Sequence, residues 1–94
     1  MDKQEARIIL NEEVAKLRLR SYRELRESLL REARNFGVEG PSGTPYQVEA
    51  QAFWDCGKDG PLRVFVSIDD GGWRGLVPMS ESFILAPGES LVDE

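Results

Sequence analysis

Apolar residues in the first third of the chain recur at the spacing of an amphipathic helix. At about 3.6 residues per turn, one side of such a helix carries Leu10, Val14, Leu17, Leu25, Leu29 and Phe36. The opposite side carries mainly Arg, Lys and Glu. Residues 1–36 contain no Gly or Pro, and Gly37 then supplies a helix stop signal. The pattern predicts one long helix over residues 1–36, beginning at about Lys3.

The remainder of the chain alternates apolar and polar residues with the period of two that is typical of strands. Residues 37–45 are rich in Gly and Pro and predict a linker. The three predicted strands cover residues 46–54, 62–69 and 73–79. Residues 82–86 predict either a short fourth strand or a segment that covers the sheet, and residues 87–94 predict a tail.

The turn between the second and third predicted strands indicates a register. Asp70-Gly71 suits a two-residue hairpin turn, because both central residues of that turn need a positive φ. This turn pairs Ile68 with Trp73 and so sets apolar residues opposite apolar residues.

The sequence therefore predicts an α+β fold in a single domain over residues 1–94. A long N-terminal helix packs on a three-stranded antiparallel meander, which becomes four-stranded if residues 82–86 join it. The sheet is expected within residues 46–86.

The amino-acid composition limits the kinds of catalytic and metal site that this fold can contain. The 94 residues include no His and one Cys, and the net charge is −5. Without His there is no Ser-His-Asp or Cys-His catalysis and no imidazole metal site, and one Cys makes no internal disulfide. We therefore assign no catalytic, cofactor-binding or metal-ligating residue. No apolar run reaches the roughly 18 residues of a membrane helix, and we expect a cytoplasmic protein without membrane contact.

Acidic residues gather in the two predicted turns. Asp55 and Asp59 lie in one turn, and Asp69 and Asp70 lie in the other. Carboxylate oxygens are ligands that Mg²⁺ and Ca²⁺ prefer. However, the turns lie at opposite ends of a strand of eight residues, about 25 Å apart at ~3.3 Å per residue. We therefore expect ordinary turn residues and no metal site.

Three other residue types are candidates for chemistry or recognition. Cys56 is a thiol in a turn, but no His is present to act as its base. Glu49 and Glu81 are carboxylates that we expect to be solvated on the sheet. Trp54 and Trp73 belong to a residue type that is frequent in binding hot spots. The predicted register places both on the helix-facing side, where core packing is expected.

The predicted order of one helix and three strands resembles part of a double-stranded-RNA-binding domain. Over about residues 20–77, the matching motifs are Pro45-Tyr46, Gly60-Pro61 and Phe65-Val66. In that family a Lys-rich start of a final helix contacts the phosphates, whereas residues 78–82 of this chain are acidic. Residues 37–94 hold three basic and ten acidic side chains, the wrong sign for phosphate contacts. The resemblance therefore implies a shared topology and carries over no RNA-binding residue.

The length of the predicted helix indicates how the protein assembles. A helix of about 34 residues spans ~51 Å, whereas the strands span ~25 Å. Its N-terminal half would project beyond the sheet with an uncovered apolar stripe. A second uncovered patch lies on the polar sheet face, where the predicted register sets Phe65 opposite Leu76. Either the chain's own C-terminal residues or another subunit covers it. We expect a homodimer with the interface residues Leu10, Val14, Leu17, Phe53, Phe65 and Leu76.

These features predict a non-enzymatic, homodimeric module for protein–protein interaction or regulation. The alternative is a small-molecule-binding protein or enzyme, with its site between sheet and helix or at the dimer interface. A third hypothesis is an RNA-binding module that uses the Arg residues of the helix. The net charge of −5 disfavours nucleic acid as a partner.

Overall fold

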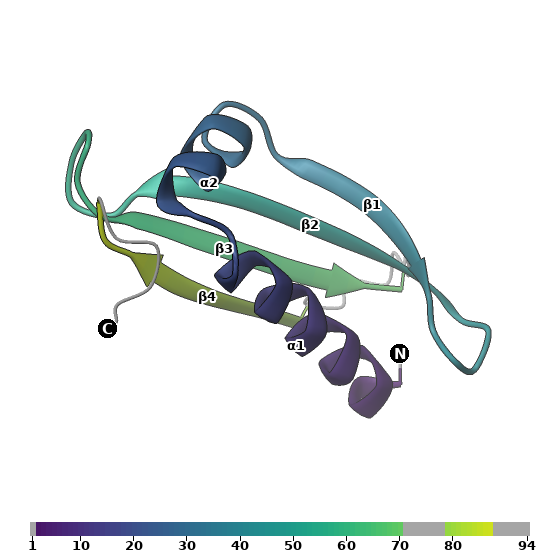
Figure 1. Ribbon diagram of the computed structural model, residues 1–94. Coiled ribbons are helices and arrows are strands. Elements are labelled where there is room, and N and C mark those ends of the chain that lie inside the picture. Colours follow the sequence, from purple (N-terminus) through teal and green to yellow (C-terminus); the bar gives the residue numbers. More distant parts are fainter. Residues whose placement is uncertain (1, 71–78, 88–94) are drawn as a thin grey trace.

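The computed structural model describes residues 2–70 and 79–87 and shows an α+β fold (Figure 1). The elements are α1 (Lys3–Arg18), α2 (Tyr22–Leu29), β1 (Arg34–Glu39), β2 (Pro45–Trp54), β3 (Leu62–Asp69) and β4 (Met79–Leu85). The strands form one antiparallel sheet in the order β1-β2-β3-β4, so each strand pairs with its neighbour in sequence. The predicted fold class is confirmed, and the meander has four strands.

The first third of the chain forms two helices, so the prediction of one helix over residues 1–36 is wrong. Asp2 caps α1, which ends at Arg18. Ser21 then begins α2 with a capping box. Its hydroxyl accepts a hydrogen bond from the Glu24 amide (3.1 Å), and the Glu24 carboxylate accepts one from the Ser21 amide (3.0 Å). The extended backbone of Ser21 (ψ 159°) interrupts the helical path, and α1 is therefore only 16 residues long.

The predicted linker over residues 37–45 is also wrong, because its first part belongs to β1. Phe36 pairs with Val48 across the β1–β2 ladder, which sets two apolar residues against each other. The chain reverses only at residues 40–44, where Gly43 has a φ of +90°. That backbone conformation favours glycine, because it has no Cβ.

β4 is the strand that pairs with β3, which changes the predicted register. Ile68 pairs with Met79, so the predicted pairing of Ile68 with Trp73 is wrong. The predicted hairpin turn and most of the predicted strand 73–79 lie outside the described residues. The prediction of a fourth strand over residues 82–86 is confirmed, because most of that segment belongs to β4.

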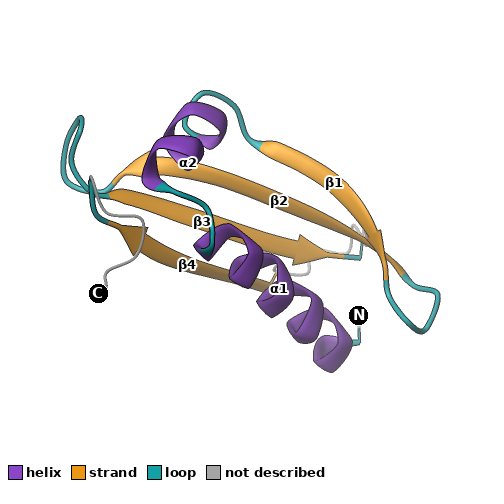
Figure 2. Ribbon diagram, in the orientation of Figure 1, coloured by secondary structure: helices purple, strands orange, loops and turns teal. Residues whose placement is uncertain are grey.

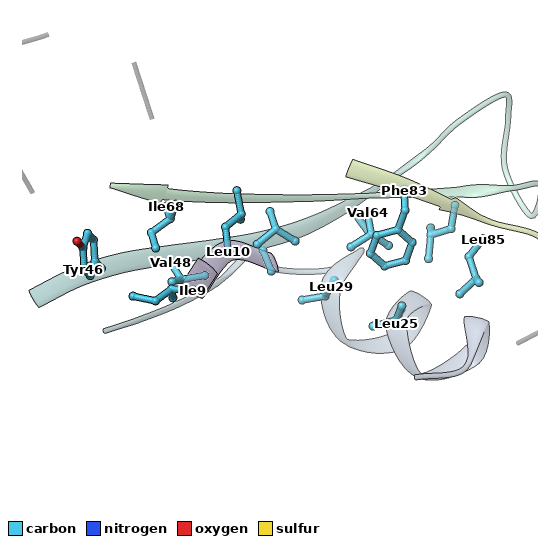
Figure 3. Close-up of a cluster of buried hydrophobic side chains, with 14 of the residues drawn as sticks. Ile9, Leu10, Leu25, Leu29, Tyr46, Val48, Val64, Ile68, Phe83 and Leu85 are labelled. Carbon is cyan, nitrogen blue, oxygen red and sulfur yellow. The ribbon is translucent and has the colours of Figure 1, made fainter. Parts of the chain in front are cut away.

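Both helices cover the same face of the sheet (Figure 2). α1 contacts β3 and β4, and α2 contacts β2. Apolar side chains fill the space between the two layers, and Figure 3 shows most of them. The buried core consists of Ala6, Ile9, Leu10, Tyr22, Leu25, Leu29, Tyr46, Val48, Ala50, Ala52, Leu62, Val64, Val66, Ile68, Phe83 and Leu85. Alternate residues of β2 and β3 point into this core, as expected for strands with one covered face.

A polar cluster fastens α1 to the β1–β2 turn. The Glu5 carboxylate accepts hydrogen bonds from the Tyr46 hydroxyl (2.7 Å) and from the Ser42 amide and hydroxyl (2.9 and 2.7 Å). These hydrogen bonds, that from Tyr46 above all, lower the pKa of the Glu5 carboxyl. The bond to Glu5 also raises the pKa of Tyr46 to about 12, since it holds the phenol proton. Gly40 lies so close that a Cβ there would be 2.7 Å from Glu5 Cδ.

A second polar cluster fastens α2 to the β2–β3 turn, at the other end of the sheet. The Tyr22 hydroxyl donates to the carbonyl of Gly60 (2.7 Å). Arg26 forms an ion pair with Asp59. The Arg26 guanidinium also lies over the ring of Trp54, 5.1 Å from its centroid, which is within cation–π range. Each helix thus holds one turn of the meander.

The fold departs from the double-stranded-RNA-binding domain that the predicted order resembles. β1 is an additional strand before Pro45, and residues 79–85 form a strand where that family has its final helix. The topological resemblance is therefore limited to β2 and β3.

Candidate interaction surfaces

A groove opens on the helix-covered side of the sheet, between α1 and β1. It has a volume of about 410 Å³, and a hollow of about 290 Å³ adjoins it beside α2. Leu17, Arg20 and Arg34 line both spaces. The groove exists because the main helix–sheet contacts fall on β2, β3 and β4, which leaves room above β1.

The groove has an apolar floor and a charged rim. The floor is formed by Phe36, Val38, Val48, Ala50 and Val66. The rim holds Lys16, Arg20 and Arg34, together with one acid, Glu13, which is paired with Lys16 at 3.0 Å. The Arg34 guanidinium lies over the Phe36 ring, 5.2 Å from its centroid. The rim therefore carries a positive charge in a chain whose net charge is −5.

The opposite face of the sheet carries three large apolar side chains that are open to solvent. Phe53, Phe65 and Ile84 are 48%, 36% and 49% exposed, and we call them the outer patch. They come from the neighbouring strands β2, β3 and β4, where they alternate with buried core residues. Both described helices lie on the other side (Figure 2).

Arg63 lies in the middle of the outer patch, with its charge compensated. In the register it is opposite Phe53 on one side and Ile84 on the other. Its guanidinium pairs with Asp55, at 3.1 Å from Nε and 3.0 Å from Nη2 to Oδ1, and its Nη1 is 3.3 Å from Ser82 Oγ. The outer patch therefore presents apolar surface around an ion pair without net charge.

The predicted helix interface needs correction. Leu10 is fully buried in the core of its own chain and so has no surface to offer another subunit. Val14 and Leu17 are partly buried against the same core. The prediction that the N-terminal half of the helix projects beyond the sheet is wrong, because α1 ends at Arg18 and packs on β3 and β4.

The predicted sheet-face residues have a different outcome. Phe53 and Phe65 are exposed on the outer face, where a partner can reach them. Phe65 pairs with Ser82, so the predicted pairing of Phe65 with Leu76 is wrong. Leu76 itself lies outside the described residues.

The acidic turn residues are not brought together. Asp55 pairs with Arg63, and Asp59 pairs with Arg26. Within residues 2–70 and 79–87, no group of three or more Asp, Glu or Cys side chains has the geometry to hold a metal ion. Cys56 is an exposed free thiol.

The two candidate carboxylates, Glu49 and Glu81, lie on opposite faces of the sheet. Glu49 is opposite Ser67 on the outer face, whereas Glu81 is opposite the buried Val66 and pairs with Arg7 at 2.7 Å. They therefore do not form a site together. Trp54 is packed against the core, as predicted, and Trp73 lies outside the described residues.

Sequence reasoning missed Ile84 and the residues of the groove. The alternation of residues 79–85 places Ile84 on the face opposite Phe83 and Leu85, but it identifies a face only once the segment is known to be a strand. Arg34 and Phe36 were assigned to a helix, and only their place in β1 brings them to the groove.

Comparison with known proteins finds no matching family model, no matching curated protein and no matching solved structure. Neither α1 nor α2, the helices in the described part of the chain, has the length and apolar character to cross a membrane.

Proposed function

We propose that the protein is a non-enzymatic interaction module that forms a homodimer through the outer patch. The observation that carries this proposal is the exposure of three large apolar side chains on neighbouring strands, on a face without a described helix. Clusters of large exposed apolar side chains mark interaction sites in soluble proteins. Phe and Ile in such a patch gain free energy when a second surface removes them from water.

A second copy of the chain is the partner that the composition of the outer patch favours. The net charge of −5 repels a nucleic acid at a distance, and it also repels a second copy, so a dimer has to be held by contacts at the patch itself. At the outer patch, however, Arg63 is neutralised by Asp55. Two copies related by a two-fold axis bring this patch against itself, so apolar surface meets apolar surface without like charges at the centre.

The size of the sheet face limits the area that such a dimer buries. A strand of eight residues is ~26 Å long and four strands are ~19 Å wide, which gives a face of roughly 500 Å² per copy. Two faces then bury roughly 1,000 Å², the lower bound of specific interfaces. We therefore expect a dimer that dissociates on dilution in the micromolar range.

The decisive experiment is size exclusion with light scattering over a range of protein concentrations. The wild-type mass should rise toward twice the 10.6 kDa of one chain. Phe65→Glu should stay at the mass of one chain, because it places a charge in the outer patch. The control is Asn11→Glu, which adds the same charge on exposed α1 and should leave the dimer intact. A wild-type mass of one chain at every concentration overturns the proposal.

The proposal places the protein in the cytoplasm, where an exposed single thiol such as Cys56 stays reduced. The RNA-binding alternative is less favoured, since several of the helical Arg residues are already paired. Arg23 pairs with Glu27 at 3.6 Å, and Arg26 is held by Asp59.

A further inference from the structure

The groove between α1 and β1 is separate from the outer patch, because it lies on the opposite face of the sheet. We propose that this groove binds a small amphipathic anion, which consists of one anionic head group on an apolar chain or ring system of about ten carbon atoms. This inference goes beyond the proposed dimer and does not depend on it.

The floor of the groove supplies the apolar half of the site. Phe36 and Val38 of β1 are only partly buried, although they face the helix-covered side. Val48 and Ala50 of β2 continue the same surface, and Val66 of β3 closes it beneath α1. Val48, Ala50 and Val66 are at most 3% exposed, so they shape the floor and have little surface left to cover. An apolar group seated there removes from water its own surface and that of Phe36 and Val38, which is favourable in proportion to the area.

The rim supplies the charged half of the site. Arg20 and Arg34 line both the groove and the adjoining hollow, and neither forms an ion pair with any described residue. The cation–π contact between Arg34 and the Phe36 ring holds that guanidinium at the edge of the apolar floor. Guanidinium groups bind carboxylate and phosphate oxygens with paired hydrogen bonds. A molecule with an anionic head group joined to an apolar chain matches this arrangement of a cationic rim and an apolar floor.

The volume favours a small molecule over a macromolecule. About ten carbon atoms, each as large as a water molecule at ~30 Å³, fill ~300 Å³, which fits within the 410 Å³ of the groove. A helix 10 Å in diameter needs roughly 1,300 Å³ for three turns, several times what the groove offers. Ligand sites commonly enclose about 300–1,000 Å³, with apolar walls and few polar groups.

A carboxylate or phosphate head group with an apolar chain occurs both in free metabolites and in membrane lipids. The groove is recessed between α1 and β1, so the head group and the chain must both enter it. A lipid that remains in a bilayer keeps its chain among other lipids. We therefore assign the free molecule as the ligand, and the experiment includes vesicles to distinguish the two sources.

The test is calorimetric titration of the purified chain with decanoate, at concentrations where it forms no micelles. Saturable binding of one decanoate per chain is expected. Butyrate has the same head group and too short a chain, and decyltrimethylammonium has the same chain and the opposite charge. Both should bind at least about tenfold more weakly, since each lacks one half of the match.

Variants identify the site. Arg20→Gln combined with Arg34→Gln should weaken decanoate binding about tenfold or more. The matched control Arg23→Gln replaces a guanidinium that lines neither the groove nor the hollow, and it should bind as the wild type does. Circular dichroism verifies that the variants are folded. Phe65→Glu should keep full decanoate affinity, which separates this inference from the proposed dimer.

Three results overturn the inference. The first is an absence of saturable decanoate binding up to about 1 mM. The second is equal affinity for decyltrimethylammonium or equal affinity in the double Arg variant, because either shows that the rim does not select the anion. The third is tight binding to vesicles of phosphatidylglycerol without binding of free decanoate, because it assigns the site to a lipid surface.

Discussion

Leu10→Ala tests whether α1 belongs to the core of its own chain or to an interface between chains. Leu10 is fully buried in the same cluster as Ile9, Val48 and Ile68 (Figure 3). If this burial is intramolecular, the substitution should lower the free energy of unfolding by the same amount at every protein concentration. If another subunit provided the burial, the loss would depend on concentration through mass action.

The magnitude follows from the groups removed. Alanine lacks three carbon atoms of the leucine side chain, which at ~0.8 kcal/mol each gives ~2.4 kcal/mol of lost transfer free energy. The residual cavity adds to this, and buried Leu→Ala changes commonly cost about 3–5 kcal/mol. A domain of 94 residues has roughly 5–14 kcal/mol of total stability. We expect a loss of about 3–4 kcal/mol and a melting temperature lower by roughly 15–25 °C.

Urea unfolding followed by circular dichroism, at two protein concentrations at least tenfold apart, measures this loss. Leu19→Ala is the control, because Leu19 is 81% exposed just after α1 and its truncation should change stability by less than about 0.5 kcal/mol. Equal effects of the two substitutions, or a Leu10→Ala effect below about 1 kcal/mol, would refute the packing of α1 on the sheet.

Four further predictions concern the polar clusters at the two turns. The pKa of Glu5 is lowered on folding, so its hydrogen bonds add stability at pH values above the unfolded-state pKa, and this stability is lost as the pH falls through the folded-state pKa. Urea unfolding between pH 3 and 7 should therefore show that the free energy of unfolding depends less on pH in Glu5→Gln than in the wild type. The pKa of Tyr46 is raised to about 12 on folding, so its hydrogen bond to Glu5 also adds stability, which is lost as the pH rises from about 10 to about 12. Absorbance titration of the phenolates should show that Tyr46 ionises at an unusually high pH, and in Glu5→Gln it should ionise at a lower pH. Gly40→Ala should cost about 1–3 kcal/mol because its Cβ displaces the Glu5 carboxylate, whereas Gly37→Ala, with its nearest neighbours at 3.7 Å, should cost less than about 1 kcal/mol. Tyr22→Phe removes one hydrogen bond to a turn carbonyl and should cost about 0.5–1.5 kcal/mol in urea unfolding.

The sequence predicts most of the sheet correctly, because an alternation of apolar and polar residues over eight or more positions fits a strand and does not fit the period of a helix. β2 and β3 are found close to the predicted residues 46–54 and 62–69. The single long helix was wrong for two physical reasons. The capping box at Ser21 and Glu24 begins a second helix, so the helical path is interrupted without any Gly or Pro. The pair Phe36 and Val38 is too short to show whether its period is two or 3.6.

The candidate surfaces were predictable only in part. Phe53 and Phe65 alternate with core residues within long strands, so their place on the outer face follows from the pattern. The groove did not follow from any pattern. It depends on Arg34 lying in β1, on Arg20 lying just after α1, and on the space between these elements, which is set by where α1 packs on the sheet. Long-range packing of that kind is not encoded in the spacing of neighbouring residues.

The placement of α1 on the far strands of the sheet constrains when the protein can fold. α1 is synthesised before the strands on which it packs, because β3 and β4 are the last elements described. Arg7 and its ion-pair partner Glu81 are 74 residues apart in sequence. On the ribosome, the apolar side of α1 therefore emerges long before the surface that will cover it. Contacts between segments so far apart in sequence are slow to form, so the apolar side of α1 stays uncovered until β3 and β4 have been synthesised.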